Sequence, residues 1–260
     1  MQFESGRVSV VVPTRGRPDL LRRCRAALER QTLPVEIVVV EDSNGRGPAW
    51  ARNEGVERAQ GEVVCFTDDD CEPTAGWVEA LAAPILAAEA RAAAGPTVVG
   101  PEATAADRAW ETILAYLQQQ AGTPGTASPG FAATANLAAS RTLLEELPFD
   151  ESFPMAAGED RDWAERAASR GAAPRFVPAA VVAHSSGLSG RSFLRQQYRY
   201  GKGAAGYRNA KSGRGRGSPS FYAGLLRAGF NAGIAPGFLV CAAQAATLAG
   251  VLSARAAARR

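Results

Sequence analysis

Three apolar runs near the N-terminus, each ending in polar residues, constrain the fold more than any other feature of the sequence. They cover residues 7–14 (R-V-S-V-V-V-P-T), 35–42 (V-E-I-V-V-V-E-D) and 62–67 (E-V-V-C-F-T). A helical pattern that opens at Pro18 and another over Ala49–Ala59 separate them. Because the runs are continuously apolar rather than alternating, they predict parallel strands covered on both faces and joined by right-handed crossovers. The sequence therefore predicts an α/β fold.

Polar side chains follow all three predicted strands. Thr14 and Arg15 lie at the end of the first, Asp42 ends the second, and Asp68–Asp70 follow the third. In an open α/β sheet, the carboxyl ends of the strands form the edge where ligands bind. Three adjacent carboxylates repel one another, and a divalent cation that holds a phosphate would neutralise them. Taken alone, the triplet is equally compatible with a solvated acidic turn, but the other two strand ends favour a ligand site.

The rest of the chain continues the pattern less regularly. We expect further helices over residues 77–93, 108–120, 142–147, 158–170 and 192–209, a loop over 121–130, and extended chain over 96–101 and 175–184. We assign residues 1–210 to one α/β domain and residues 211–260 to a basic linker followed by an apolar helical segment.

The distribution of charge is more informative than the overall composition. The 260 residues are 46% hydrophobic and 21% charged, as in an ordinary globular protein, and the net charge of +3 does not indicate a nucleic-acid partner. No acidic residue occurs after Arg191. The C-terminal part therefore suits an anionic ligand or an anionic membrane surface.

The pattern of cysteine and histidine residues indicates a reducing compartment and argues against a zinc site. The four cysteines form no C-x-x-C pair, and the chain has one histidine. Cysteines without a disulfide pattern are typical of reducing compartments. The N-terminal residues lack the apolar core of a signal peptide, so we expect a cytoplasmic protein.

Six short motifs follow one another in an informative order: V-V-V-P-T-R, V-V-V-E-D-S, A-R-N-E-G, F-T-D-D-D-C-E-P, G-E-D-R-D-W and a late histidine. In this order they resemble glycosyltransferase family 2, over about residues 7–205. The resemblance implies the GT-A fold, a Rossmann-like, mixed and mainly parallel sheet flanked by helices. It also implies inverting transfer from a nucleotide-diphosphate sugar, most often a UDP-sugar.

The resemblance implies a binding site for the donor nucleotide at the predicted sheet edge, formed by Thr14, Arg15, Asp42, Arg52 and Asp68. The family often has two aspartates where this chain has Glu41–Asp42. From the residues alone, Asp42 could instead cap a turn and Arg52 could form a surface ion pair. With the family pattern, we favour the nucleotide role for both.

The same resemblance implies a metal site. Displacement of a nucleotide diphosphate leaves negative charge on phosphate, which a bound Mg²⁺ or Mn²⁺ offsets as a Lewis acid. In the D-x-D pattern of Asp68–Asp70, Asp70 would contact this metal and His184 would complete the site. Imidazole suits Mn²⁺ better than Mg²⁺. Without the resemblance, a lone histidine is more often structural. Asp69 has no predicted role.

A catalytic base is expected in G-E-D-R-D-W. The acceptor hydroxyl is a poor nucleophile and needs a carboxylate to take its proton. By the family match that carboxylate is Asp160, with Glu159 beside it. From the residues alone, these acids could simply stabilise the N-terminus of a helix.

Three further residues are implied at the donor sugar and diphosphate: Asn136, Arg199 and Lys202. Asn136 ends a small-residue segment whose backbone could approach the sugar, or which could be a tight turn in the core. Arg199 and Lys202 lie in R-Q-Q-Y-R-Y-G-K-G, which approximates a Q-x-x-R-W motif with tyrosine in place of tryptophan but is more typical of a basic amphipathic helix.

We therefore expect a metal-dependent glycosyltransferase that acts on a glycan, lipid-linked or small-molecule acceptor. Two alternatives remain from the sequence: a non-catalytic sugar-nucleotide-binding scaffold and a nucleotidyltransferase. The apolar segment Asn231–Ala254 is long enough to cross a bilayer, but Pro236 and Gly237 weaken that prediction. A helix at the cytoplasmic face of the membrane or one packed on the domain fits as well.

Overall fold

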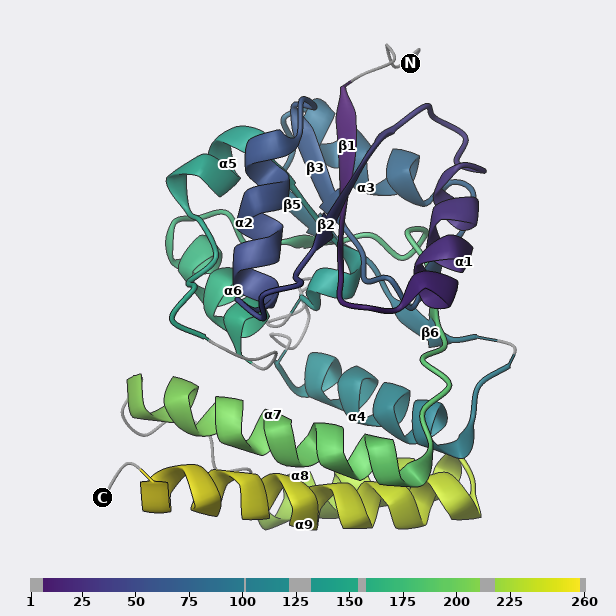
Figure 1. Cartoon of the computed structure of the whole chain (residues 1–260), viewed down its shortest axis with the longest axis vertical. Helices are drawn as coiled ribbons and strands as arrows, with labels where there is room; N and C mark the ends of the chain where they lie inside the picture. Colours follow the sequence, from purple (N-terminus) through teal and green to yellow (C-terminus); the bar gives the residue numbers. More distant parts are fainter. Residues whose placement is uncertain (1–6, 101, 122–131, 154–157, 211–217, 258–260) are drawn as a thin grey trace. The chain divides into compact units, whose positions relative to one another are not determined.

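The computed structural model describes residues 7–100, 102–121, 132–153, 158–210 and 218–257 (Figure 1). The chain forms two compact units, the first from residues 1–98, 118–152 and 159–184, the second from residues 99–117, 153–158 and 185–260. This division differs from the predicted boundary at residue 210. Helix α7 (Gly190–Ala210) groups with the C-terminal helices and not with the sheet.

The first unit is built on a six-stranded sheet with the order β2-β1-β3-β7-β5-β8. Its strands are β1 (Val8–Thr14), β2 (Glu36–Glu41), β3 (Val63–Phe66), β5 (Ala92–Ala94), β7 (Leu137–Ser140) and β8 (Arg175–Phe176). β1 pairs in parallel with β2 and β3, as predicted, whereas β7 runs antiparallel to both of its neighbours. The expected mixed, mainly parallel sheet is confirmed.

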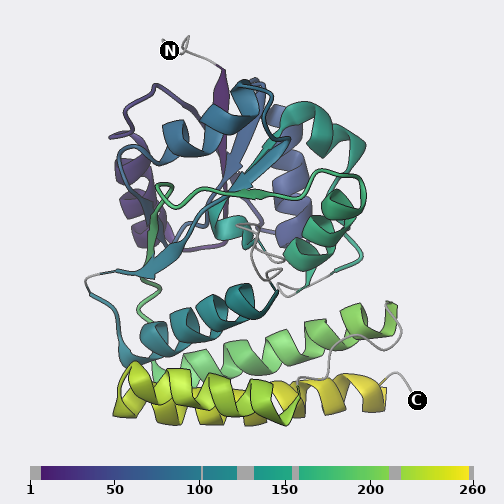
Figure 2. The same ribbon diagram turned by 180° about the vertical axis from the view of Figure 1, so that it is seen from behind.

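Helices cover both faces of this sheet (Figures 1 and 2). They are α1 (Pro18–Leu28), α2 (Pro48–Arg58), α3 (Trp77–Leu86), α5 (Arg141–Glu146) and α6 (Glu159–Ser169). Val11 and Phe66 pack on one face with residues of α2, α5 and α6, while Val10 and Cys65 pack on the other with α1 and α3. Burial on both faces explains why the strands are continuously apolar.

The alanine-rich stretch after Trp77 departs from the prediction. The helix expected over residues 77–93 ends at Leu86, and Ala92–Ala94 form β5 between β7 and β8. Alanine favours helix locally, but here pairing with two neighbouring strands overrides that preference.

A small second sheet completes the ligand edge. It has the order β4-β9-β6, with strands β4 (Cys71–Pro73), β9 (Val182–His184) and β6 (Thr97–Val99). β4 and β9 are antiparallel, and Cys71 lies directly opposite His184. This pairing brings the end of the aspartate triplet to the histidine, more than a hundred residues later in the chain.

In the second unit, the described helices are α4 (Ala105–Ala121), α7, α8 (Pro219–Asn231) and α9 (Ile234–Ala257). Phe193 of α7, Leu225 of α8 and Val240 of α9 pack with α4 residues in one core. The predicted apolar segment Asn231–Ala254 corresponds largely to α9, and α8 precedes it across Gly233, which has a φ of 132°. The predicted linker at 211–217 and most of the loop at 121–130 lie outside the described residues.

Candidate active site

The three aspartates lie between β3 and β4, and Asp69 anchors this segment, which we call the aspartate turn. Asp69 is fully buried; the hydroxyl of Thr14 donates to its Oδ2 at 2.6 Å, and the Arg17 guanidinium pairs with its carboxylate. Nη1 of Arg17 also lies 3.0 Å from Oδ2 of Asp70. Asp69, which had no predicted role, therefore ties the aspartate turn to the end of β1.

Arg17 is the main site residue that the sequence did not predict. Burial alone would lower its pKa, but the carboxylates of Asp70, Asp69 and Asp68 raise that pKa above its usual value. Burial raises the pKa of Asp69, while the Thr14 hydrogen bond and the Arg17 charge oppose the increase. The available signal was a cation three residues beyond the end of β1, at the edge that also holds the acids.

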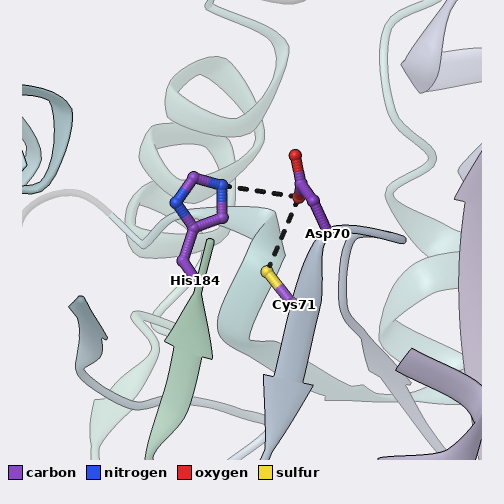
Figure 3. Close-up of side chains that lie close together, drawn as sticks. All are labelled: Asp70, Cys71 and His184. Atoms are coloured by element: carbon purple, nitrogen blue, oxygen red, sulfur yellow. Dashed lines mark hydrogen bonds and ion pairs between the residues drawn. The ribbon is translucent and has the colours of Figure 1, made fainter. Parts of the chain in front are cut away.

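Asp70 and His184, the two predicted metal ligands, lie close together (Figure 3). Nε2 of His184 lies 3.4 Å from Oδ1 of Asp70, and both side chains are at most 10% exposed. The Cys71 thiol donates to the same oxygen at 3.9 Å. One potential ligand atom from each of the three residues lies within 4.8 Å of the other two.

This donor set fits a divalent cation, with Asp70 and His184 as the protein ligands. A carboxylate oxygen and an imidazole nitrogen suit Mn²⁺, and imidazole is less suited to Mg²⁺. Burial, followed by the charges of Asp70 and Asp68, raises the pKa of the Cys71 thiol well above its usual value. Because the thiolate is the form that binds metal, Cys71 is the weakest donor of the three.

Arg52 connects two acidic segments that are far apart in the sequence. Its guanidinium is buried, with Nη1 3.1 Å from Oε1 of Glu159 and Nη2 3.2 Å from Oδ1 of Asp68. Burial would lower the pKa of Arg52, but Asp68, Glu159 and Asp160 raise it. Arg52 is therefore not a surface ion pair. It holds the N-terminus of α6 against the aspartate turn.

Asp160 differs from the other acids at this edge. Among the described residues its carboxylate accepts one hydrogen bond, from the backbone N–H of Arg161 at 2.7 Å. Burial, and then the charge of Glu159, raise the pKa of Asp160 to about 7, although Arg52 lowers it. The charge of Asp68 also raises this pKa, so the two carboxylates are electrostatic neighbours. A carboxylate with a pKa near neutrality is suited to accept a proton.

Asp42 lies at the sheet edge, in the turn that leads into α2. It is buried, and its two oxygens accept hydrogen bonds from the backbone N–H groups of Arg46 (2.7 Å) and Gly47 (2.9 Å). Asp42 therefore caps the turn, as the alternative interpretation of the sequence proposed. A carboxylate oxygen that accepts one hydrogen bond can still accept a second one from a ligand. Arg15 is exposed. Its guanidinium lies beside this turn, since a Cβ built on Gly45 would be 3.0 Å from its Nη2.

Asn136 has a structural role in this fold. Its Oδ1 accepts from Nε1 of Trp77 at 2.8 Å, and its Nδ2 donates to the carbonyls of Pro96 (2.9 Å) and Ala180 (2.8 Å). Both amide hydrogens are used by the protein, so we do not retain Asn136 in the donor site. Gly130, which precedes it in the predicted loop, lies outside the described residues.

Arg199 and Lys202 belong to the second unit. Both are exposed on α7, and Gln196 of the same motif donates to the Tyr200 hydroxyl at 2.9 Å. Tyr200 in turn packs on Trp110 with ring centroids 5.1 Å apart. Gln196 and Tyr200 therefore lie on the packed side of α7. The role of Arg199 and Lys202 at the diphosphate stays a prediction.

Comparisons with known proteins give a family match that lies mostly in the first unit. Residues 42–135, which include Asp42, Arg52 and the aspartate turn, match the model of the family described as Glycosyl transferase family 2. This match and the curated relatives below support the assignment of the chain to glycosyltransferase family 2. The predicted resemblance is thereby confirmed.

Two curated relatives extend the match. A pre-mycofactocin glycosyltransferase of Mycobacterium tuberculosis is 28% identical over 226 residues, which cover 76% of this chain and 47% of the relative. The glycosyltransferase AglE of Haloferax volcanii is 24% identical over 233 residues, which cover 75% of this chain and 72% of AglE. The chain thus spans about half the length of the first of these relatives.

A solved structure supports the GT-A architecture. The mannosyltransferase of Pyrobaculum calidifontis, determined in complex with GDP-Man and Mn²⁺, has a TM-score of 0.52 and 22% identity. The match covers 98% of this chain and 76% of the mannosyltransferase. The chain therefore has the GT-A fold that the motif order implied.

Proposed function

We propose that this chain is a metal-dependent, inverting glycosyltransferase that moves a sugar from a nucleotide-diphosphate sugar to a hydroxyl group. The observation that supports this most strongly is the bridge from Arg52 to both Asp68 and Glu159. It places Asp160, a carboxylate with a pKa near neutrality, beside the segment proposed to hold the donor. The bridge thus joins the segment proposed to bind the donor to the segment proposed to activate the acceptor, which are far apart in the sequence.

The donor nucleoside would bind at the ends of β1 and β2, near Thr14, Arg15 and Asp42. Arg15 is exposed beside the turn that Asp42 caps, so its guanidinium is available to an anionic ligand. Asp68 is one-third exposed, despite its pairing with Arg52, and could accept from a ribose hydroxyl. The resemblance implies a UDP-sugar, whereas the solved mannosyltransferase holds GDP-Man, so both belong in the first substrate panel.

Asp70 and His184 would hold Mn²⁺ or Mg²⁺ through Oδ1 and Nε2. When bound, the cation supplies Lewis-acid stabilisation of the departing diphosphate. Arg17 keeps the other oxygen of Asp70 and the Asp69 carboxylate neutralised, so Oδ1 faces the histidine. The mechanism needs no thiolate, in agreement with the strongly raised pKa of Cys71.

Asp160 would act as the general base. Its carboxylate takes the proton of the acceptor hydroxyl while that oxygen forms a bond to the anomeric carbon. The bond from the anomeric carbon to the diphosphate oxygen breaks on the opposite face, which inverts the configuration. Glu159 would be a positioning residue, because it is buried against Arg52 and maintains the charge that raises the pKa of Asp160. The acceptor could be a glycan, a lipid-linked sugar or a small molecule.

Asp160→Asn tests this proposal, with Asp150→Asn as the control because Asp150 is an exposed aspartate whose carboxylate accepts from the backbone N–H of Ser152. Calorimetry should show the same donor affinity, with Mn²⁺ present, for both variants and the wild type. The transfer rate of Asp160→Asn should fall by about 10²–10⁴-fold. Transfer at the wild-type rate would refute the base assignment. A wild-type chain that binds donors but never turns them over would instead be a scaffold, and pyrophosphate release would indicate a nucleotidyltransferase.

A further inference from the structure

Helix α9 has an apolar face that the rest of the protein leaves uncovered. Ile234, Phe238, Leu248 and Leu252 are 76%, 65%, 58% and 55% exposed. At 3.6 residues per turn, their spacing places all four within one narrow sector of the helix. Among the described residues, α9 is the helix long and apolar enough to cross a membrane, yet only 28% of its most apolar 18-residue stretch is buried.

Helix α8 extends this apolar face. Phe230 near its C-terminus is 45% exposed and contacts Phe238 edge-to-face, with ring centroids 5.6 Å apart. We use the term α8–α9 face for the exposed side chains of Phe230, Ile234, Phe238, Leu248 and Leu252. Contiguous exposed apolar surface of this kind marks an interaction site.

The charge of the C-terminal part of the sequence indicates which kind of partner the α8–α9 face suits. Residues 191–260 contain twelve lysines and arginines and no acidic residue. Within α7, Arg191, Arg195 and Arg199 recur every four residues and are all exposed, so they form a basic stripe. Each cation near an anionic bilayer contributes about 1 kcal/mol, whereas a second copy of this unit would bring like charges together.

The packing of α7 against α9 decides how α9 can meet the bilayer. A Cβ on Gly201 would lie 2.1 Å from the carbonyl oxygen of Thr247, and a Cβ on Gly250 would lie 2.1 Å from that of Tyr198. The two helices therefore pack with their backbones in close contact, side by side in both views (Figures 1 and 2). If α9 crossed the bilayer, α7 would bring its cations into the hydrocarbon at about 2.5–3.5 kcal/mol each.

We propose that the α8–α9 face binds the surface of an anionic lipid bilayer, with α9 lying in the plane of the interface. The apolar side chains enter the boundary between head groups and acyl chains, and the basic residues of the second unit contact the anionic head groups. This proposal depends only on the second unit. It remains testable whether or not the transferase assignment in the first unit is correct.

Sedimentation of the full chain with vesicles of equal parts phosphatidylcholine and phosphatidylglycerol tests the proposal. The wild type should partition strongly, and much less to pure phosphatidylcholine. Phe238→Glu should weaken binding by about 10–100-fold, the loss expected when one large apolar side chain is no longer buried. The matched control is Val98→Glu, since Val98 is 41% exposed and lies outside the α8–α9 face. Circular dichroism confirms that each variant is folded.

The orientation of α9 is tested with Phe238→Trp and Leu248→Trp in vesicles that contain brominated lipids. An interfacial helix predicts the same shallow depth for both indoles. A spanning helix would separate them by about 15 Å along the bilayer normal and would overturn the in-plane proposal. Failure of the wild type to bind anionic vesicles, or equal losses for Phe238→Glu and Val98→Glu, would overturn the membrane proposal itself. So would a concentration-dependent dimer that Phe238→Glu dissociates.

Discussion

The two acidic segments at the sheet edge use the same residue types in different electrostatic settings. In the aspartate turn, Arg17 pairs with Asp69 and Asp70 and Arg52 pairs with Asp68. At the start of α6, the carboxylate of Asp160 accepts a hydrogen bond from a backbone N–H, which is its one donor in the described part of the chain, and its pKa rises to about 7. Carboxylates that pair with arginine side chains (compensated) can help to hold a cation, whereas a carboxylate with a pKa near 7 (uncompensated) can exchange a proton. The partners of each acid therefore indicate its function better than the acids themselves.

The largest expected effect comes from removal of the residue that joins the two segments. Arg52→Met removes the buried cation that pairs with Glu159 and Asp68, so the free energy of unfolding should fall by about 3–5 kcal/mol. Arg58→Met is the matched control on the same helix, because its pair with Glu54 is exposed and contributes at most about 1 kcal/mol. Urea denaturation measures both, and similar losses for the two variants would show that the bridge has no special role.

Metal binding at the compensated segment can be observed through the single histidine. Because His184 is the only histidine in the chain, its imidazole NMR signals need no assignment by mutation. Stoichiometric Mn²⁺ should broaden these signals. In Asp70→Asn, the same broadening should require an Mn²⁺ concentration about 10–100-fold higher. Cys71→Ser should change the affinity much less. Unaltered His184 signals at saturating Mn²⁺ and donor would exclude this residue as a ligand.

The pH dependence of transfer should report the uncompensated segment. A general base must be deprotonated, so the rate should rise about tenfold per pH unit up to about pH 7 and then level off. Glu159→Gln removes a charge that raises the pKa of Asp160, so the midpoint should move to lower pH. Initial rates across a series of buffers measure both profiles. An unchanged midpoint in Glu159→Gln would contradict the coupling between the two acids.

The smallest expected effect is a gain in stability when the uncompensated charge is removed. The folded protein binds the Asp160 proton up to about pH 7, whereas the unfolded chain releases it near the ordinary aspartate pKa, so stability falls as pH rises between the two. Asp160→Asn has no such loss. It should be more stable than the wild type by about 1–2 kcal/mol at alkaline pH and equally stable in acid. Thermal unfolding at both pH values measures this, and an inactive but destabilised variant would indicate a structural role.

Local sequence features predicted the parallel half of the sheet and the acids at its edge. The strands β1, β2 and β3 are recognisable because burial on both faces requires continuous apolar runs. The antiparallel strand β7 and the alanine strand β5 were not predicted, because their residues have no local strand preference and are fixed by neighbouring strands.

The charge partners were less accessible from the sequence than the site residues. Arg17 is adjacent to the motif that was recognised, but its pairing with Asp69 and Asp70 depends on how the β1–α1 connection turns towards the aspartate turn. Asn136 matched a small-residue pattern, yet its amide is used by Trp77 and two backbone carbonyls. A motif gives the residue type at a position, whereas its hydrogen-bond partners depend on tertiary contacts.

Direct titration of Asp160 tests the central comparison most clearly. The side-chain carboxyl ¹³C signals of aspartates can be followed against pH in the full chain, and the signal absent from Asp160→Asn identifies Asp160. We expect a midpoint near pH 7 for this carboxyl, set by burial and by the charge of Glu159. A midpoint near 4, the ordinary value for aspartate, would contradict it, because Asp160 would then be no different from a compensated or solvated acid.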